Sequence, residues 1–283
     1  MVENRPWLTV ASHAVLIVGV VVIILPLYVA FIGATQTQDA MLHVPIPLTP
    51  GNQLWVNLRT LLFTGAGGGA DAPPVWLMLF NSLVMALGIA LGKIAISIIA
   101  AYAVVYFSFP FRMTCFWAIF VTLMLPVEVR ILPTYKVVAD LGLLNSYGGL
   151  ILPLIASATA TFLFRQFFLT VPDELTEAAR IDGAGPVRFF LHILLPLSRT
   201  PIAALLVIQF IYGWNQYLWP LIITTKQNYY TVVMAVSRIA VVGDSIAQWN
   251  LVMALALLAT VPPVLVVVFL QRQFVKGLVE TEK

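Results

Sequence analysis

The amino-acid sequence predicts an all-α integral membrane protein with six transmembrane helices, and three observations support this fold class. Hydrophobic residues make up 61% of the 283 residues and charged residues only 10%, whereas a soluble domain is roughly 25% charged. Several long stretches lack any charged side chain, and each can hold the ~20 apolar residues that cross a bilayer. The alternating pattern typical of a transmembrane β-barrel is not found in the sequence.

Four predicted spans fall in uncharged stretches. These stretches lie between Arg5 and Asp39, between Asp140 and Arg165, between Arg199 and Lys226, and between Asp244 and Arg272. The other two predicted spans contain charges: residues 76–107 include Lys93, and residues 114–132 include Glu128 and Arg130. Residues 8–32 are too long for a signal-peptide core of ~7 to 15 residues, so they are expected to form an uncleaved first span.

The distribution of Lys and Arg predicts the orientation. Six spans put both termini on one side, and a cytoplasmic placement puts most basic residues inside, as the positive-inside rule requires. Topology therefore explains the net charge of +3, and no nucleic-acid role is predicted. The predicted parts are a first helix with an external loop (1–76), a core of five helices (77–272) and a cytoplasmic tail (273–283). The loop is rich in Pro and Gly and is expected to be irregular.

No catalytic or metal-binding pattern is found. Cys115 is the single cysteine and the three histidines lack metal-ligand spacing. The stretch from Gly88 to Lys93 misses the spacing of a phosphate-binding loop and its final Ser or Thr, so no cofactor is predicted in this chain. Gly88 and Gly92 are instead expected to form a face for close helix packing.

A polar segment between the fourth and fifth predicted spans, residues 169–200, is patterned as two short helices. Thr170 can cap the first helix, and Gly183 can end it because glycine accepts the left-handed conformation. Pro186 can open the second helix and Pro196 can close it. The second helix has an apolar stripe of Phe189, Phe190, Ile193 and Leu194, which needs a protein or lipid surface to cover it. A helix lying on lipid would usually contain more Lys and Arg.

This segment contains a recognisable pattern. Its fixed positions are Glu177, Ala178 and Ala179, then Gly183, and then Ile193, Leu195 and Pro196. The complete spacing on a cytoplasmic loop resembles the EAA loop of ABC importer permeases. The resemblance extends to Asn81-Ser82, Gly213-Trp214-Asn215 and Leu218-Trp219-Pro220. The chain is thus similar to the second permease subunit of the carbohydrate-uptake branch, the group that includes the maltose importer.

Residues 3–9, 124–130 and 211–220 are further similar to permeases of sn-glycerol-3-phosphate importers. The resemblance implies import of glycerol 3-phosphate or a glycerophosphodiester, and the alternative is an uncharged sugar or polyol. A secondary transporter would be expected to show repeated halves and several buried ionisable residues. A membrane enzyme would need a cluster of catalytic side chains. Neither feature is found in the sequence.

The resemblance also implies partners and a location. The family's type I transmembrane domain works in the bacterial inner membrane with a homologous second permease, two ATPase subunits and a periplasmic solute-binding protein. ATP and Mg would bind the ATPase subunits, so this chain would not be an enzyme. The EAA loop would sit in a cleft of the ATPase with Glu177 in contact. The alternative for Glu177 is a solvated helix charge.

Two sets of residues are candidates for the translocation pathway. The first set is Trp214, Asn215, Gln216, Tyr217 and Trp219, whose polar members are costly in lipid; they face the pathway or pack against the partner permease. The second is Lys93, with Glu128 and Arg130 nearer the outer end. Three interpretations apply to Lys93: it reaches an interface, it pairs with Glu128, or it lines the route of a phosphate group.

Overall fold

The computed structural model describes residues 6–65, 73–122, 127–240 and 247–279, and only the backbone of residues 6, 127–128 and 272–279. All regular secondary structure within these ranges is helical, as predicted. The chain divides into two compact units. One comprises Met1–Leu77 and Ala235–Val261, and the other comprises Met78–Met234 and Pro262–Lys283.

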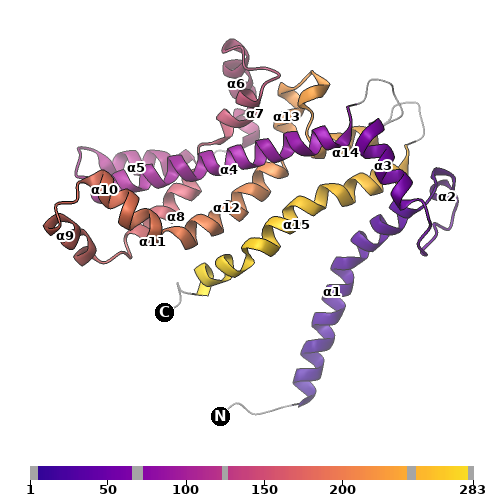
Figure 1. Cartoon of the computed structure of the whole chain (residues 1–283), viewed down its shortest axis with the longest axis horizontal. Coiled ribbons are helices and arrows are strands. Elements are labelled where there is room, and N and C mark those ends of the chain that lie inside the picture. The colour runs from indigo at the N-terminus through magenta and orange to yellow at the C-terminus, as the bar shows by residue number, and fades with distance from the viewer. Residues whose placement is uncertain (1–5, 66–72, 123–126, 241–246, 280–283) are drawn as a thin grey trace. The chain divides into compact units, whose positions relative to one another are not determined.

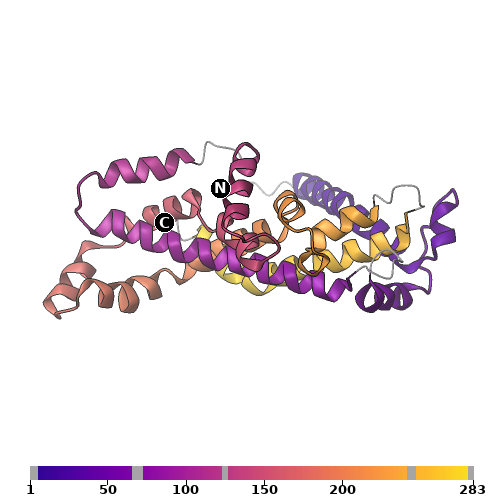
Figure 2. The ribbon, with the colours of Figure 1, turned by 90° about the horizontal axis from the view of Figure 1, so that it is seen from above.

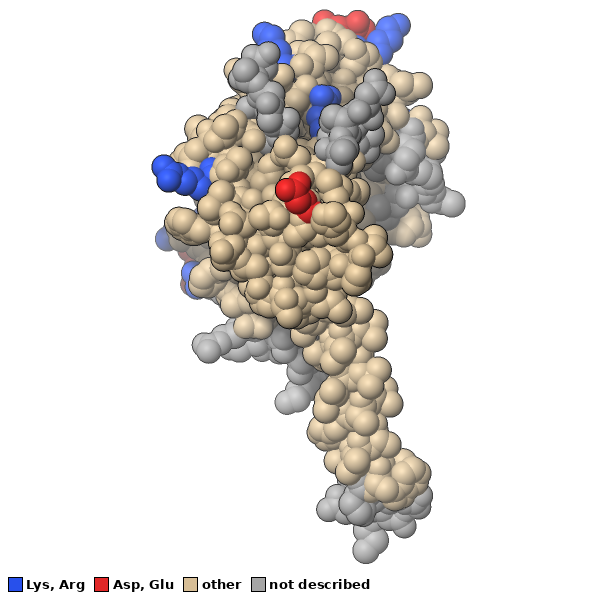
Figure 3. All heavy atoms as spheres, turned by 90° about the vertical axis from the view of Figure 1, so that its right-hand side faces the viewer, with Lys and Arg blue, Asp and Glu red and all other residues tan. Residues whose placement is uncertain are grey.

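The first unit begins with α1 (Pro6–Thr35), which confirms the first predicted helix. The helix is long and apolar enough to cross a membrane. Its apolar side chains are mostly exposed, as expected of a helix that contacts lipid. On the face of the molecule shown in Figure 3, charged side chains (blue and red) are sparse and uncharged residues (tan) predominate. The surface has the character expected of a protein surrounded by lipid.

The expectation of an irregular external loop holds for residues 43–53 but is wrong for residues 38–42 and 54–64, where two helices follow α1. They are α2 (Gln38–Leu42) and α3 (Leu54–Thr64). The described prolines and glycines of this loop flank these helices rather than interrupt them. Asn57 on α3 is buried and its Nδ2 donates to the carbonyls of Ala34 and Gln36, each at 2.9 Å. Asn250 Nδ2, on the first part of α15 (Trp249–Val279), donates to Asn57 Oδ1 at 3.0 Å, which ties three helices together.

The second unit is organised around α4 (Val75–Tyr106), which Figures 1 and 2 show as a long helix. Three glycines allow close packing against it. A Cβ built on Gly88 would lie 2.6 Å from Ile151 Cδ1, one on Gly92 would lie 2.5 Å from Ile155 Cγ2, and one on Gly213 would lie 2.9 Å from Ala86 Cα. The predicted close-packing face of Gly88 and Gly92 is therefore confirmed.

We expect Gly92→Ala to destabilise the protein more than Gly88→Ala. The new Cβ at position 88 meets the end of a flexible side chain, whereas at position 92 it meets a branch methyl and the Cβ of Ile155. Overpacking costs about 1–3 kcal/mol, and alanine returns about 1 kcal/mol of helix propensity. Thermal unfolding in detergent should therefore show a lower Tm for Gly92→Ala. A Tm drop that is equal for both variants, or not relieved by Ile155→Ala in the Gly92→Ala background, would contradict this packing.

The other predicted spans correspond to helices of several kinds. The sixth is the apolar part of α15, Trp249–Gln271. The fourth is bent by 50° between α7 (Tyr147–Ile151) with η2 (Leu152–Leu154) and α8 (Ala158–Phe168). The fifth is α12 (Arg199–Trp214), a three-residue break, and α13 (Leu218–Ile223). By length and composition the described residues hold three spans, or up to five if two bent pairs each count as one span. These pairs are Tyr147–Leu154 with Ala158–Phe168, and Pro186–Leu197 with Arg199–Trp214.

The third predicted span, residues 114–132, is not a single helix in the described ranges. The structure has α5 (Arg112–Val121) and α6 (Val127–Asp140), and residues 123–126 lie outside the description. α5 packs on α8, with the rings of Phe120 and Phe162 5.6 Å apart. Each helix is shorter than the ~20 residues needed to cross a bilayer. Glu128 and Arg130 mark this stretch as a less regular span, but they do not predict where either helix begins or ends.

A buried polar cluster fixes the segment that follows α13. Asn81, fully buried on α4, donates from Nδ2 to the carbonyls of Asn228 (2.8 Å) and Tyr230 (3.0 Å), and accepts from the Tyr147 hydroxyl (2.6 Å). Ser82 Oγ accepts from the Val232 amide at 2.8 Å. η4 (Gln227–Tyr229) and the start of α14 (Val232–Ala240) are thereby held on α4.

Candidate coupling helices and membrane-embedded cation

The first helix of the polar segment is α9 (Asp173–Ile181), and its end follows from one glycine. Gly183 has φ +71°, in the left-handed region. Its amide donates to the Arg180 carbonyl at 3.0 Å and the Ala184 amide donates to the Ala179 carbonyl at 2.8 Å. These two bonds form a Schellman motif, which satisfies the last carbonyls of the helix. The predicted role of Gly183 as the helix end is confirmed.

The start of α9 differs from the prediction. The N-cap residue is Pro172, which makes no side-chain cap, and the Thr170 hydroxyl instead donates to the Phe167 carbonyl at 2.7 Å. Thr170 lies in the turn that ends α8, so its hydroxyl is used by the preceding helix. The first turn of α9 contains Asp173 and Glu174, whose charges favour the positive end of the helix dipole.

The second helix begins at Pro186, as predicted, with α10 (Pro186–Phe189). It continues through a π-helical turn, η3 (Phe190–Leu194), and α11 (Leu195–Leu197). In the π turn the Leu195 amide donates to the Phe190 carbonyl. Pro196 has no amide hydrogen and cannot continue the ordinary ladder. The helix ends at Leu197, one residue after Pro196, and the chain turns by 71° into α12.

The apolar stripe of the second helix is covered by this chain itself, not only by a partner or lipid as expected. Phe189 and Leu194 are buried, while Phe190 and Ile193 are half-buried. The covering side chains come mainly from α4 and α8, because a cluster of buried residues joins all three helices. Tyr106 of α4, for example, lies with its ring centroid 5.4 Å from that of Phe189.

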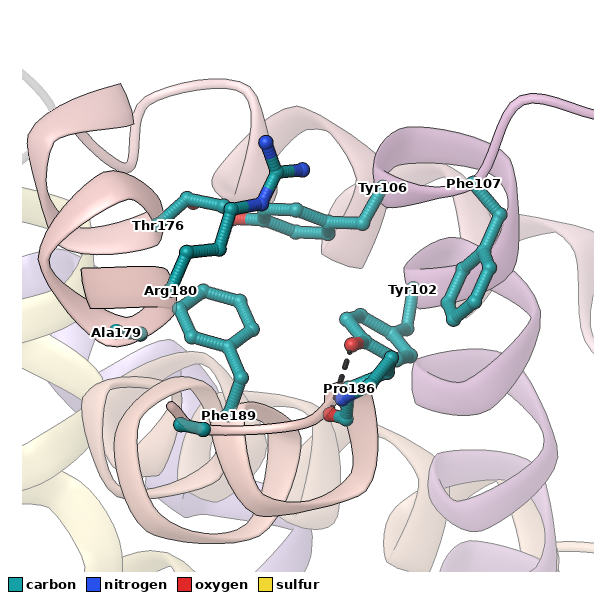
Figure 4. Close-up of a pocket in the computed structure, with 9 residues that line it drawn as sticks. Tyr102, Tyr106, Phe107, Thr176, Ala179, Arg180, Pro186 and Phe189 are labelled. Carbon is teal, nitrogen blue, oxygen red and sulfur yellow. Dashed lines mark hydrogen bonds between the residues drawn. The ribbon is translucent and has the colours of Figure 1, made fainter. Parts of the chain in front are cut away.

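Both helices of the pair meet the end of α4 around a small pocket (Figure 4). Its walls include Tyr102 and Tyr106 of α4, Thr176 and Arg180 of α9, and Phe189 of α10; its volume is about 130 Å³. The Tyr102 hydroxyl donates to the Pro186 carbonyl at 2.9 Å, a bond drawn as a dashed line in the figure. The angle between the helix pair and α4 is thus set by aromatic packing and one hydrogen bond.

The outward side of the pair presents the sequence-predicted coupling residues. Glu177, Ala178 and Gly183 are exposed, whereas Ala179 is buried against α4 and α8. Of the later motif positions, Ile193 and Leu195 are half-buried and Pro196 is exposed. The motif therefore divides between residues that can meet a partner and residues that hold the pair on the membrane helices.

Lys93 lies on α4 and is 6% exposed. Its Nζ donates to Gln209 Oε1 on α12 at 3.1 Å and lies 3.5 Å from the centroid of the Tyr212 ring. This position argues against a side chain that reaches an interface. Glu128 has no described side chain, so its predicted pairing with Lys93 lies outside the description. Arg130, on α6, is exposed.

The predicted pathway set on the fifth span is divided by the helix break. Trp214 and Trp219 are buried; Trp214 stacks on Phe210, and Trp219 Nε1 donates to the Gly149 carbonyl at 3.1 Å. Asn215, Gln216 and Tyr217 form the break between α12 and α13, where Asn215 and Tyr217 are exposed and Gln216 is half-buried. The two tryptophans pack within the unit, whereas the three residues of the break keep accessible surface.

Comparison with known proteins connects these features to a family. The sequence profile of the family described as "Binding-protein-dependent transport system inner membrane component" matches residues 93–280. The chain belongs to this family. The matched stretch of this inner membrane component begins at Lys93 and contains α9, α10 and the break between α12 and α13.

Two relatives of the inner membrane component match along their full length. They are both sn-glycerol-3-phosphate transport system permease protein UgpE, from Salmonella typhi and from Escherichia coli (strain K12). Each is 56% identical over 283 residues, with 100% of both chains covered. A solved structure, of a bacterial ABC transporter involved in the import of the acidic polysaccharide alginate, matches with a TM-score of 0.83 at 17% identity. The match covers 97% of this chain and 99% of that one and shows an ABC importer permease fold.

Sequence reasoning missed two groups of residues in this inner membrane component. Ile181 and Val187 are large apolar residues that are 86% and 70% exposed on the helix pair. Ile181 follows Glu177 by four residues and so shares its face, a spacing that could have revealed it. Gln209 and Tyr212 also went unnoticed. A Gln within the apolar run of the fifth span was the available signal.

Proposed function

We propose that this chain is the permease subunit of an ABC importer that moves sn-glycerol 3-phosphate into the cell. Glycerophosphodiesters are further candidate solutes. The observation that carries this proposal is the 56% identity, over the full length, to permease proteins named for sn-glycerol-3-phosphate transport. A buried cation in the second span, Lys93, is consistent with an anionic solute.

The proposed membrane arrangement keeps the six spans predicted from sequence. Both termini face the cytoplasm, residues 77–272 form the transport core and residues 273–283 form a cytoplasmic tail. The third span uses α5 and α6 together, and the fifth uses α12 with α13. The bacterial inner membrane is the proposed location, in keeping with the family's description.

We further propose that α9 and α10 couple the core to ATP hydrolysis on a partner. Glu177 and Ala178 face outward, and Ile181 and Val187 offer an exposed apolar surface to an ATPase subunit. ATP and Mg would bind that subunit, while this chain holds no catalytic role. The complete assembly has a second, homologous permease, two ATPase subunits and a periplasmic solute-binding protein.

Uptake in cells tests the proposed solute. We expect a strain lacking this gene to lose at least nine-tenths of its ATP-dependent uptake of labelled sn-glycerol 3-phosphate, and a plasmid copy to restore it. Uptake of maltose and of glycerol serves as the control and should not change. If the deletion strain took up sn-glycerol 3-phosphate normally but lost uptake of a neutral sugar or polyol, the chain would serve the alternative importer.

A further inference from the structure

Lys93 has no charged partner among the described residues. Its ammonium group contacts an amide oxygen, Gln209 Oε1, and the face of the Tyr212 ring. Both groups are uncharged. A cation in a membrane span normally pairs with an anion or faces water, because an amide dipole and an aromatic ring replace only part of its hydration. The site is therefore electrostatically incomplete in the part of the chain that the structure describes.

Gln209 adds hydrogen-bond donors to the same place. It is 5% exposed, and its Oε1 is used by Lys93. Its Nε2 donates to no residue within the described ranges, and an amide nitrogen can donate two hydrogen bonds. An ammonium group on α4 and an amide NH2 on α12, each belonging to a buried residue, thus lie together. These donors suit an oxyanion, whereas a neutral solute would leave the ammonium without a counter-charge.

The site continues toward an exposed end. Gln209 and Tyr212 are three residues apart and share a face of α12, and Gln216 follows Tyr212 by four residues in the break after this helix. Gln216 Nε2 donates to the Tyr212 carbonyl at 3.2 Å, and it lies in the break where Asn215 and Tyr217 are exposed. A stripe of polar groups therefore runs from the helix break to Lys93 within this unit.

We propose that Lys93 and Gln209 form a subsite for the phosphate group of a phosphate monoester, which the solute occupies as it passes through the membrane. Tyr212 holds the ammonium in place until the phosphate arrives. The phosphate accepts charge-assisted hydrogen bonds from Lys93 Nζ and hydrogen bonds from Gln209 Nε2. This inference rests on the proposed function, since it names the part of the chain that recognises the anionic solute.

Two substitutions separate this role from simple packing. Lys93→Met removes the charge and keeps the length, so ATP-driven uptake of sn-glycerol 3-phosphate by the reconstituted complex should fall at least tenfold. Gln209→Glu places a carboxylate beside Lys93. This pair would satisfy a purely structural lysine, but it would compete with the phosphate and should also lower uptake at least tenfold. Lys226→Met, at an exposed position outside the site, is the matched control.

A binding measurement tests the subsite even if the solute assignment is wrong. In a Cys115→Ser background, Gln216→Cys gives one thiol at the outer end of the stripe. Inorganic phosphate or sn-glycerol 3-phosphate should slow its reaction with a small aqueous thiol reagent several-fold, and Lys93→Met should abolish that protection. If phosphate protected the thiol of Gln216→Cys in a Lys93-dependent manner but the wild-type complex did not take up sn-glycerol 3-phosphate, the proposed solute would be rejected and the subsite would be kept. Equal protection of the thiol with and without Lys93 would overturn the subsite. Uptake at the wild-type rate by fully assembled Lys93→Met and Gln209→Glu complexes would overturn it as well.

Discussion

Gly183→Val is expected to insert and assemble normally but to lose solute-stimulated ATP hydrolysis and uptake. The residue has φ +71° and forms the Schellman turn between α9 and α10. A Cβ at this position would meet no atom within 4 Å, so the cost comes from the backbone. A non-glycine residue forced into such a conformation costs roughly 1–3 kcal/mol. The variant can avoid this strain by changing the angle between the two helices, which would displace the surface that meets the ATPase.

Gly185→Val is the matched control, because Gly185 lies two residues away and its surroundings are equally open. Its φ of −69° suits any residue, so this variant should keep most of its uptake. ATPase activity and uptake should be measured in the same reconstituted complexes. Wild-type levels of both in Gly183→Val would refute the coupling role of this turn.

Asn81→Leu should strongly reduce the amount of folded protein. The substitution keeps the branched shape of the side chain but removes its hydrogen bonds to the carbonyls of Asn228 and Tyr230 and to the Tyr147 hydroxyl. An unpaired buried polar group costs about 1–3 kcal/mol, and this penalty applies most fully to the buried bond to the Tyr230 carbonyl. We expect a large drop in Tm in detergent and a low yield of the assembled complex.

Asn228→Ala provides the control for this cluster. The Asn228 side chain is exposed, and its contribution to the cluster is the main-chain carbonyl, which alanine retains. Its Tm should stay within a few degrees of the wild type. A similar Tm for both variants would show that the Asn81 hydrogen bonds do not hold the segment after α13.

Local features of the coupling segment could be predicted from sequence. Gly183 ends α9 and Pro186 begins α10 because each effect depends on the conformational range of one residue. Thr170 shows the limit of this reasoning. A hydroxyl before a helix can cap it, but here the hydroxyl donates to a carbonyl of the preceding helix, and only the structure distinguishes the two.

Features that depend on distant parts of the chain could not be predicted. Lys93 was recognised as a costly charge, yet its partner Gln209 lies 116 residues away, and no spacing rule connects them. The cover of the Phe189 stripe is likewise supplied by Tyr102 and Tyr106, which belong to a span far earlier in the sequence. The contact of Phe120 on α5 with Phe162 of α8 likewise joins residues that are far apart in the sequence.

The hydrogen bond from Tyr102 to Pro186 has a mechanical consequence. Tyr102 and Lys93 lie on the same helix, α4, nine residues apart, which corresponds to roughly 14 Å at about 1.5 Å per residue. No proline interrupts α4, so a sharp kink between these residues is not expected. A force applied to α10 would then reach the ammonium group as a shift or rotation of one stiff rod. Helix α10, which is proposed to contact the ATPase, and the ammonium group of Lys93, which is proposed to bind the solute, would therefore move together.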